Sequence, residues 1–356
     1  MEITSQKKAS PLLIIIAFAT VYVVWGSTYF FIRMAIHGFP PLLMGAVRYL
    51  IAGILLLVWC WIKGDRLWVI KDIKASAISG LLMLFIATGV VIWVERTIPS
   101  AMVAIVVSAN PVWFVVLDKV NWRINLKNKT TIAGLTVGFA GVVLLFGEAI
   151  GKSFTSAGAH VQLSGLLLLL VSPIAWCAGS LYSKNRSGNT PARLNTAWQM
   201  LIAGMAFIPA ALIHHEFNSF DIAAVPAQAW LAISYLIVFG SIGAFSAYVW
   251  LLQVRPAIQV SSHSYVNPVI AVLLGVFFAH ESISALQLFG LLVILVSVLL
   301  VNLTKYSFKK RLLKQQGTAE MPINYLEKIT PLGHGAGANN KLNLIKYQYE
   351  IANEHQ

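Results

Sequence analysis

The sequence predicts an all-α polytopic membrane protein of ten transmembrane helices, arranged as two inverted five-helix repeats with both termini in the cytoplasm. Three observations lead to this fold class. The composition is strongly apolar, ten hydrophobic runs are long enough or nearly long enough to cross a bilayer, and motifs of the first half recur in order in the second half.

Composition places the chain in a membrane. Of its 356 residues, 58% are hydrophobic and only 11% are charged, and the mean hydropathy is +0.75. A soluble domain carries roughly 25% charged residues, so lipid must solvate much of this surface. The net charge of +13 does not indicate nucleic-acid binding, because the basic residues lie in short gaps between apolar runs. Cys60 and Cys177 form neither a metal-binding spacing nor a disulfide framework.

The hydrophobic runs give the predicted spans. A helix needs about 20 apolar residues to cross a hydrocarbon core of ~30 Å. Lys7 and Lys8 precede the first run, as in a signal peptide, but the run continues through Val24 and is interpreted as an uncleaved helix. Proline begins several spans, at a position where its missing N–H is tolerated. The predicted spans are 11–32, 41–61, 75–94, 99–117, 131–148, 163–183, 195–213, 229–252, 257–279 and 285–303.

Loop charges set the orientation. With the N-terminus inside, the inward segments carry nineteen Lys and Arg residues, whereas the outward loops carry three, Arg33, Arg96 and Lys152. This asymmetry predicts that both termini are cytoplasmic and that the chain is a multi-pass protein of a bacterial-type inner membrane. The predicted organisation is an N-terminus at 1–10, a first repeat at 11–149, a linker at 150–162, a second repeat at 163–304, and a basic, then polar, disordered tail at 305–356.

Internal similarity divides the chain into two halves. Each half has five spans, and an odd number inverts the second half relative to the first. Inverted repeats that meet at the bilayer midplane are a transporter architecture, because the halves can rock around a shared site. The matching motifs are Gly26-Ser27-x-Tyr29-x3-Arg33 with Gly179-Ser180-x-Tyr182-x3-Arg186, Leu50–Gly53 with Leu201–Gly204, Trp93 with Trp250, and Pro99 plus Asn110-Pro111 with Pro256 plus Asn267-Pro268.

Several of these motifs also carry a family resemblance. Trp25–Tyr29 through Arg33, Pro40-Pro41 with Arg48, and the proline-initiated fourth and ninth spans resemble the EamA-type permeases of the drug/metabolite transporter superfamily. Glu95-Arg96-x-x-Pro99-Ser100 is similar to a branch with an acidic residue before the fourth span. The resemblance covers residues 11–304. It implies ten helices, a basket-like fold, a cavity lined mainly by spans 3, 4, 8 and 9, and export of amino acids and other metabolites.

Two Asn-Pro pairs are predicted to line the cavity. Pro111 and Pro268 each free a backbone carbonyl and kink a helix at membrane depth, which is tolerated where the freed groups face protein or water. Asn110 and Asn267 are therefore interpreted as cavity residues. The alternative is a packed kink in which each Asn bonds a neighbouring helix.

The ninth span adds polar candidates. His263 and Asn267 are four residues apart and share one helix face, with Ser262 and Tyr265 on an adjacent stripe. His263 titrates near neutral pH in water, which suits substrate binding or proton relay. The alternative is a hydrogen-bonded histidine without such a role.

Charged and aromatic residues complete the predicted site. Glu95 binds a cation or proton in an outward cavity, or pairs with Arg33 or Arg96. Arg48 is interpreted as a structural residue that closes the basket rather than a substrate contact. Trp93 and Trp250 are interpreted as cavity walls or as interfacial anchors, and Trp25 and Tyr182 are open to the same two interpretations. Gly26 and Gly179 allow close helix packing or hinge motion.

The motif search favours transport over catalysis. No H-E-x-x-H, G-x-S-x-G or Walker A pattern occurs, so we expect no enzyme, cofactor or metal site. His214-His215-Glu216 is interpreted as a solvated loop in preference to a metal site. The leading hypothesis is a secondary transporter that exports amino-acid-like or amphipathic drug-like compounds, with protons as a possible coupling ion. The alternatives are an uncoupled facilitative carrier and a membrane sensor or assembly protein.

Overall fold

The structure is a computed structural model that describes most of the predicted membrane region. The described residues are 10–98, 103, 106–122, 126, 129–154, 164–165, 167–186, 190–218, 220–279, 284–286, 288–297 and 300. Residues 1–9 of the predicted N-terminal segment and the whole predicted tail at 305–356 lie outside the described residues.

The described part is helical throughout and contains no strand, which confirms the all-α class. The first half comprises α1 (Pro11–Ala35), α2 (Pro41–Ile62), α3 (Ile70–Gly80), η1 (Leu81–Thr88), α4 (Gly89–Val94), α6 (Asn110–Leu117), η2 (Lys119–Asn121) and α8 (Lys129–Phe154). The second comprises α10 (Val171–Arg186), α11 (Ala192–Ile213), η3 (Ile222–Ala224), α12 (Ala227–Tyr235), η4 (Leu236–Phe245), α13 (Ser246–Val254), α14 (Ala257–Val260) and α15 (His263–Ala279).

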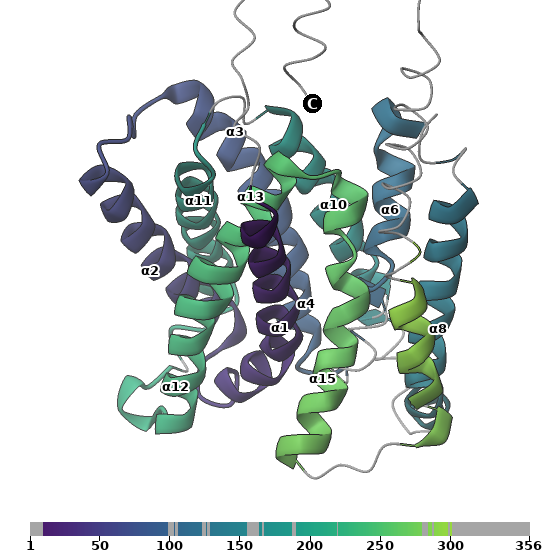
Figure 1. Ribbon diagram of the computed structural model, residues 1–356. Helices are drawn as coiled ribbons and strands as arrows, with labels where there is room; N and C mark the ends of the chain where they lie inside the picture. Colours follow the sequence, from purple (N-terminus) through teal and green to yellow (C-terminus); the bar gives the residue numbers. More distant parts are fainter. Residues whose placement is uncertain are drawn as a thin grey trace, which may run out of the picture. The chain divides into compact units, whose positions relative to one another are not determined.

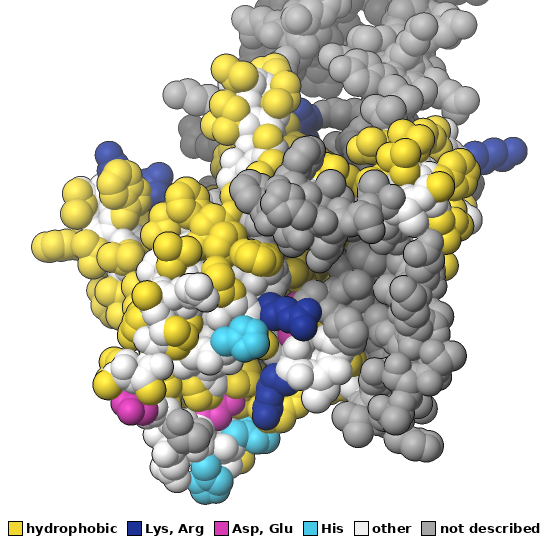
Figure 2. All heavy atoms as spheres, turned by 90° about the horizontal axis from the view of Figure 1, so that it is seen from below, with side chains coloured by type: hydrophobic (Ala, Val, Ile, Leu, Met, Phe, Trp, Pro, Cys, Tyr) yellow, Lys and Arg dark blue, Asp and Glu magenta, His cyan; other side chains and the backbone are white. Residues whose placement is uncertain are grey.

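Six helices in the described residues are long and apolar enough to span a membrane. They are Pro11–Ala35, Pro41–Ile62, Ile70–Val94, Leu167–Arg186, Ala192–Ile213 and Ala227–Val254. Their outward surfaces are apolar, as with Leu12 and Trp61, which are 65% and 70% exposed, and in Figure 2, which views the molecule from below, hydrophobic side chains lie around much of the periphery of the described part. Lipid is the solvent that such surfaces require. Of the other predicted spans, 131–148 lies within α8 and 257–279 is covered by α14 and α15, whereas 99–117 and 285–303 are described only in part, so the ten-helix topology stays a prediction.

Prolines begin several helices, as the sequence indicates. Pro11 and Pro41 occupy the first turns of α1 and α2, while Pro191 and Pro256 directly precede α11 and α14. The first amides of a helix have no intrahelical acceptor, so a residue without an N–H leaves nothing unsatisfied there. The sequence therefore fixes these helix starts locally.

Helices α2 and α11 lie side by side (Figure 1) and cross at the matching Leu-Ile-Ala-Gly motifs. A Cβ on Gly53 would lie 2.6 Å from the backbone N of Leu201, and a Cβ on Gly204 would lie 2.7 Å from the backbone N of Leu50. The glycine of each motif therefore leaves room for the leucine of the other motif. Such reciprocity is what a two-fold relation between the two helices produces.

The third helix of each half contains a π-helical segment. Residues 70–94 form one continuous helix in which η1 separates α3 from α4, and residues 227–254 form another in which η4 separates α12 from α13. A π-helical segment widens the helix and is frequently found at functional sites. Both segments contribute residues to the cavity described below.

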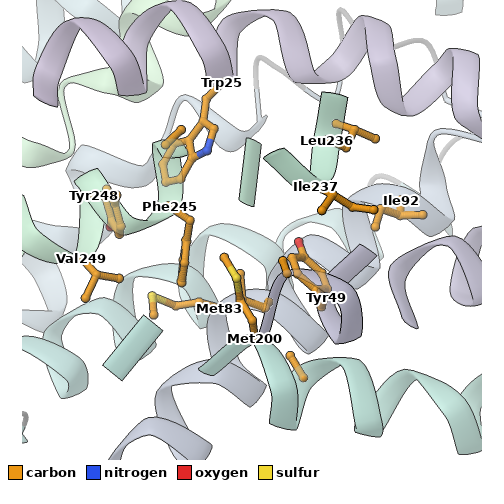
Figure 3. Close-up of a cluster of buried hydrophobic side chains, with 14 of the residues drawn as sticks. Trp25, Tyr49, Met83, Ile92, Met200, Leu236, Ile237, Phe245, Tyr248 and Val249 are labelled. Atoms are coloured by element: carbon orange, nitrogen blue, oxygen red, sulfur yellow. The ribbon is translucent and has the colours of Figure 1, made fainter. Parts of the chain in front are cut away.

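The largest buried cluster lies between the two halves. Figure 3 shows Trp25, Phe245 and Tyr248 close together, with Met83 and Tyr49 further along the same cluster. Its members come from α1, α2, η1, α4 and α6 of the first half and from α10, α11, α12, η4, α13 and α14 of the second. This core holds the cavity-lining helices together.

Candidate functional site

A cavity of about 100 Å³ lies among helices of both halves. Its wall combines apolar residues with a small number of hydroxyl, amide, imidazole and guanidinium groups. The lining residues are Trp25, Thr28, Tyr29 and Ile32 of α1; Arg48 and Tyr49 of α2; Leu84, Ala87 and Thr88 of η1; Val91 of α4; Val107; Asn110 of α6; Ser172 and Trp176 of α10; Gly240, Ser241 and Phe245 of η4; and His263 and Asn267 of α15.

Aromatic rings form one side of the cavity. Trp25 packs against Trp176 and His263, with ring centroids 5.3 and 5.0 Å apart and both contacts edge-on. Tyr248 lies behind them, 5.0 Å from Trp25 and 5.3 Å from His263. Edge-on pairs at these separations are favourable beyond the area that they bury. The wall is therefore a rigid surface that suits an apolar or aromatic part of a ligand.

Hydrogen bonds hold these rings in place. The indole N–H of Trp176 donates to the Tyr248 hydroxyl at 2.9 Å, and that hydroxyl is 2.7 Å from Ser180 Oγ. The indole N–H of Trp25 donates to the Gly240 carbonyl at 3.3 Å. Since polar ring atoms are satisfied within the wall, the ring faces and edges are what the cavity presents.

The bonding of His263 defines its tautomer. Nδ1 lies 2.8 Å from the carbonyl oxygen of Val260, which can only accept, so Nδ1 carries the hydrogen. Nε2 lies 3.3 Å from Ser264 Oγ. In the neutral form of the ring, Nε2 is then an acceptor, and it lies next to a hydroxyl.

Asn110 and Asn267 both line the cavity, one from each half. Asn110 Nδ2 donates to Ser264 Oγ at 3.0 Å, which links α6 to α15. The Cys177 thiol donates to the Asn110 carbonyl at 3.3 Å. Asn267 is 5% exposed, and its Oδ1 is buried without a hydrogen-bond partner among the described residues. Asn267 therefore lines the cavity as a residue while its Oδ1 is an unused acceptor with almost no accessible surface, an exception to the usual pairing of buried polar atoms.

Arg48 reaches the cavity from α2. It is 5% exposed, its Nε donates to Ser241 Oγ at 2.8 Å, and its guanidinium lies 5.0 Å from the Tyr49 ring centroid. Sequence reasoning interpreted Arg48 as a basket-closing residue. The bond to Ser241 does tie α2 to η4, but the same side chain also lines the cavity.

Five other predicted site residues do not line this cavity. Ser262 bonds the Tyr22 hydroxyl at 2.6 Å, and Tyr265 donates to the Leu135 carbonyl of α8 at 3.1 Å. Trp250 is half-buried against the main cluster. Trp93 packs on His214, with ring centroids 4.7 Å apart. A substrate-binding role for these residues stays a prediction that would require a different conformation.

Glu95, the fifth of these residues, follows the last turn of α4. It is 7% exposed, and neither carboxylate oxygen has a hydrogen-bond partner among the described residues. Arg33 is the charged group that acts on it electrostatically, while Arg96 lies over the Trp93 ring at 4.8 Å. Of the two predicted partners, Arg33 is therefore the one that influences the carboxylate.

The predicted kinks differ in position from the prolines. The helical path is interrupted at residues 108–109 and 261–262, so Pro111 lies in the first turn of α6, whereas Pro268 lies inside α15. Gly26 and Gly179 lie inside unbroken helices at close contacts. A Cβ on them would lie 2.5 Å from the Ile270 Cβ and 2.7 Å from the Met83 Cγ, respectively. Packing accounts for both glycines, and hinge motion stays a prediction.

Sequence reasoning missed some participants. Trp176 and Ser241 lie in spans of ordinary composition, and the only available signal for Ser241 is its place between Gly240 and Gly243. Glu216 was interpreted as part of a solvated loop. It is instead 6% exposed and accepts the amide hydrogens of Leu42 and Leu43 at the start of α2. Within the described residues, no cluster of three or more His, Cys, Asp or Glu suits a metal.

Comparison with known proteins identifies the family. A model of the EamA-like transporter family matches the chain over residues 12–147 and again over 163–303. The chain belongs to this EamA-like family. It is 35% identical over 297 residues to "Uncharacterized inner membrane transporter YedA" of Escherichia coli (strain K12), covering 82% of this chain and 91% of the relative.

More distant EamA-like relatives and a solved structure agree with the assignment. "Uncharacterized transporter YvbV" of Bacillus subtilis (strain 168) is 26% identical over 285 residues, covering 80% of this chain and 90% of that protein. A solved structure described as "Crystal structure of protein" has a TM-score of 0.67 at 18% identity, covering 85% of this chain and 99% of that one, which shows likeness of fold. The EamA-like chain is a multi-pass cell-membrane protein of a transporter family, with a small-molecule substrate and the lipid bilayer as its environment.

Proposed function

We propose that the protein is a secondary transporter that exports small metabolites by alternating access around the described cavity. The observation that carries this proposal is the cavity's wall, to which both halves of the chain contribute. A site between two halves opens to either side when one half rocks against the other. The proposal includes ten helices in two inverted repeats, with both termini cytoplasmic.

Three features of the fold support the inverted arrangement. The two family matches divide the chain near residues 147–163. The π-helical segments η1 and η4 occupy the third helix of each half. The contacts of Gly53 with Leu201 and of Gly204 with Leu50 are reciprocal.

The size of the cavity favours small substrates. Drug-sized ligands occupy pockets of roughly 300–1,000 Å³, whereas this cavity holds about 100 Å³. Amino-acid-like metabolites fit this volume better than amphipathic drug-like compounds. The aromatic wall and the few polar groups also describe a site that binds rather than one that catalyses, so we propose that the protein is not an enzyme.

Transport by the purified protein in liposomes tests the proposal. Proteoliposomes are loaded with a mixture of amino acids and small carboxylates, and efflux is followed by mass spectrometry with and without an imposed pH gradient. Efflux that exceeds that of protein-free liposomes and depends on the gradient supports proton-coupled export. Efflux that is the same with and without the pH gradient identifies an uncoupled facilitative carrier. No efflux of any component above protein-free liposomes refutes the proposal.

Deletion of residues after 310 should leave efflux largely intact, whereas a sensor or assembly protein would depend on its tail.

A further inference from the structure

The charge balance of the cavity identifies a chemical group of its ligand. Among the described residues that line the cavity, Arg48 is the one Lys or Arg, and none is Asp or Glu. Within the described residues, no carboxylate lies within 4 Å of the Arg48 guanidinium. The ion pair that this part of the chain contains joins Arg193 to Asp65. The cavity therefore holds one positive charge without a counter-charge.

Three other cationic side chains of the described region have carboxylate or carbonyl partners. Arg193 makes a bidentate pair with Asp65, with two bonds of 2.6 Å. Lys184 donates to the carbonyls of Leu252 and Arg255 at the end of α13. Arg33 acts on Glu95. Arg48 has a neutral hydroxyl and an aromatic ring instead.

The free donors of Arg48 face the cavity. Its Nε is used by Ser241, and neither terminal nitrogen donates to another described residue. Neither of those nitrogens is fully buried, although the residue as a whole is 5% exposed. Gly240 leaves room for them, because a Cβ there would lie 3.1 Å from Nη2. Two adjacent guanidinium N–H groups match the two oxygens of a carboxylate.

We propose that Arg48 anchors the substrate by binding a carboxylate group, so that the transported molecules are small organic acids or amino acids. A single guanidinium neutralises a monoanion, whereas a phosphate ester would leave a negative charge in the cavity. Asn267 lines the same cavity, so its side chain lies beside the remainder of the bound molecule. The inference rests on the proposed transport function and names its substrate class.

Matched probes test the carboxylate directly. The melting temperature of the purified full-length protein is measured with benzoate and benzamide, 3-phenylpropionate and its amide, L-leucine and L-leucinamide, and phenyl phosphate. We expect stabilisation by one or more acids and not by the paired amides, because only a folded-state ligand raises the melting temperature. In Arg48→Gln the affinity for those acids should fall about tenfold to a hundredfold, the range for charged hydrogen bonds. The affinity of Arg48→Lys for those acids should lie between the affinities of the wild type and of Arg48→Gln, because lysine keeps the charge but lacks the planar guanidinium.

Stability without ligand separates recognition from a structural role, even if no probe binds. A buried charge that lacks a counter-charge destabilises the empty protein, so Arg48→Gln should raise the melting temperature by about 2–4 °C. Arg193→Gln is the matched control, because it removes a paired arginine outside the cavity lining and should lower the melting temperature slightly.

Several results would overturn the inference. Equal binding of acids and amides, an acid preference that survives in Arg48→Gln, or a preference for phenyl phosphate would each do so. An unchanged or lower melting temperature of ligand-free Arg48→Gln would assign the residue a structural role instead. The proposed function fails separately: acids that bind through Arg48 but never leave proteoliposomes contradict transport, whereas neutral solutes that are transported contradict only the carboxylate.

Discussion

Glu216 connects the loop after α11 to the first turn of α2. Its two carboxylate oxygens accept the amide hydrogens of Leu42 and Leu43, at 3.3 and 2.8 Å. Pro40 precedes α2 and provides no side-chain cap. Because these first-turn amides have no acceptor within the helix, the carboxylate of Glu216 replaces the missing N-cap. It also places a negative charge at the positive end of the helix dipole.

The expected cost of removing this carboxylate follows from its bonds. A hydrogen bond to a charged group contributes about 1.5–3 kcal/mol, and the bond to Leu42 is long, so it counts at the low end. We therefore expect Glu216→Ala to destabilise the protein by about 2–3 kcal/mol. Glu216→Gln keeps one acceptor and should cost about 1 kcal/mol. For domains of about 150–250 residues, 1 kcal/mol corresponds to about 2–4 °C in melting temperature, so the shifts in this longer chain should lie at or below the low end of that range.

Thermal unfolding of the detergent-solubilised protein measures these shifts. Asp221→Ala is the matched control, because Asp221 lies in the same loop region, is exposed, and accepts one amide hydrogen from Ala223 at 2.9 Å. We expect the order wild type, Asp221→Ala, Glu216→Gln, Glu216→Ala, from most to least stable. If Glu216→Ala unfolds at the same temperature as Asp221→Ala, the capping argument is wrong.

Three further predictions concern the α2–α11 contact, a loop ion pair and the cavity. Gly53→Ala and Gly204→Ala should each destabilise by about 1–3 kcal/mol, the usual effect of overpacking, and unequal melting temperatures would contradict the reciprocal contact. Hydrogen bonding to its arginine partner lowers the pKa of Asp65, so the pair stabilises the fold above the unfolded pKa of about 3.9 and this stabilisation is lost as pH falls below it. Asp65→Asn should therefore reduce the fall in melting temperature at acid pH. An unchanged fall would show that other groups govern it. His263→Ala and Asn267→Ala should reduce efflux from proteoliposomes at least tenfold while shifting the melting temperature by only a few degrees, and wild-type efflux kinetics would remove both from the site.

The helical class and several helix starts were predictable because they depend on local chemistry. Pro11, Pro41, Pro191 and Pro256 begin or precede helices wherever they fall in the tertiary structure. Membrane residence was predictable for the same reason, since length and hydropathy of a segment decide whether it can cross a bilayer. Residues at the cavity depend on which helix face meets which neighbour, and one span does not contain that information.

The ninth span shows this limit clearly. Its polar run suggested four site residues, and His263 and Asn267 line the cavity, consistent with their shared face. Ser262 and Tyr265 point instead to Tyr22 and to the Leu135 carbonyl. Polarity within a span indicates that a residue needs a partner, but a neighbouring helix supplies that partner as readily as a ligand does.

Arg48 and Gln199 show the same limit at equivalent positions of the two repeats. Counting back two residues from the matching Leu-Ile-Ala-Gly motifs places them at equivalent positions in α2 and α11. Gln199 is buried among hydroxyls, and its Nε2 donates to Ser79 and Ser183 at 2.8 and 3.1 Å. Arg48 has one hydroxyl partner, and its terminal nitrogens face the cavity. The fold therefore provides two equivalent places for a polar side chain. One holds an amide whose Nε2 is bonded internally and whose Oε1 has no partner among the described residues, and the other holds a charge with one hydroxyl partner. An anionic ligand can neutralise a cation without a counter-charge but not an unpaired amide oxygen, so Arg48 is the position at which we propose that the ligand's carboxylate binds.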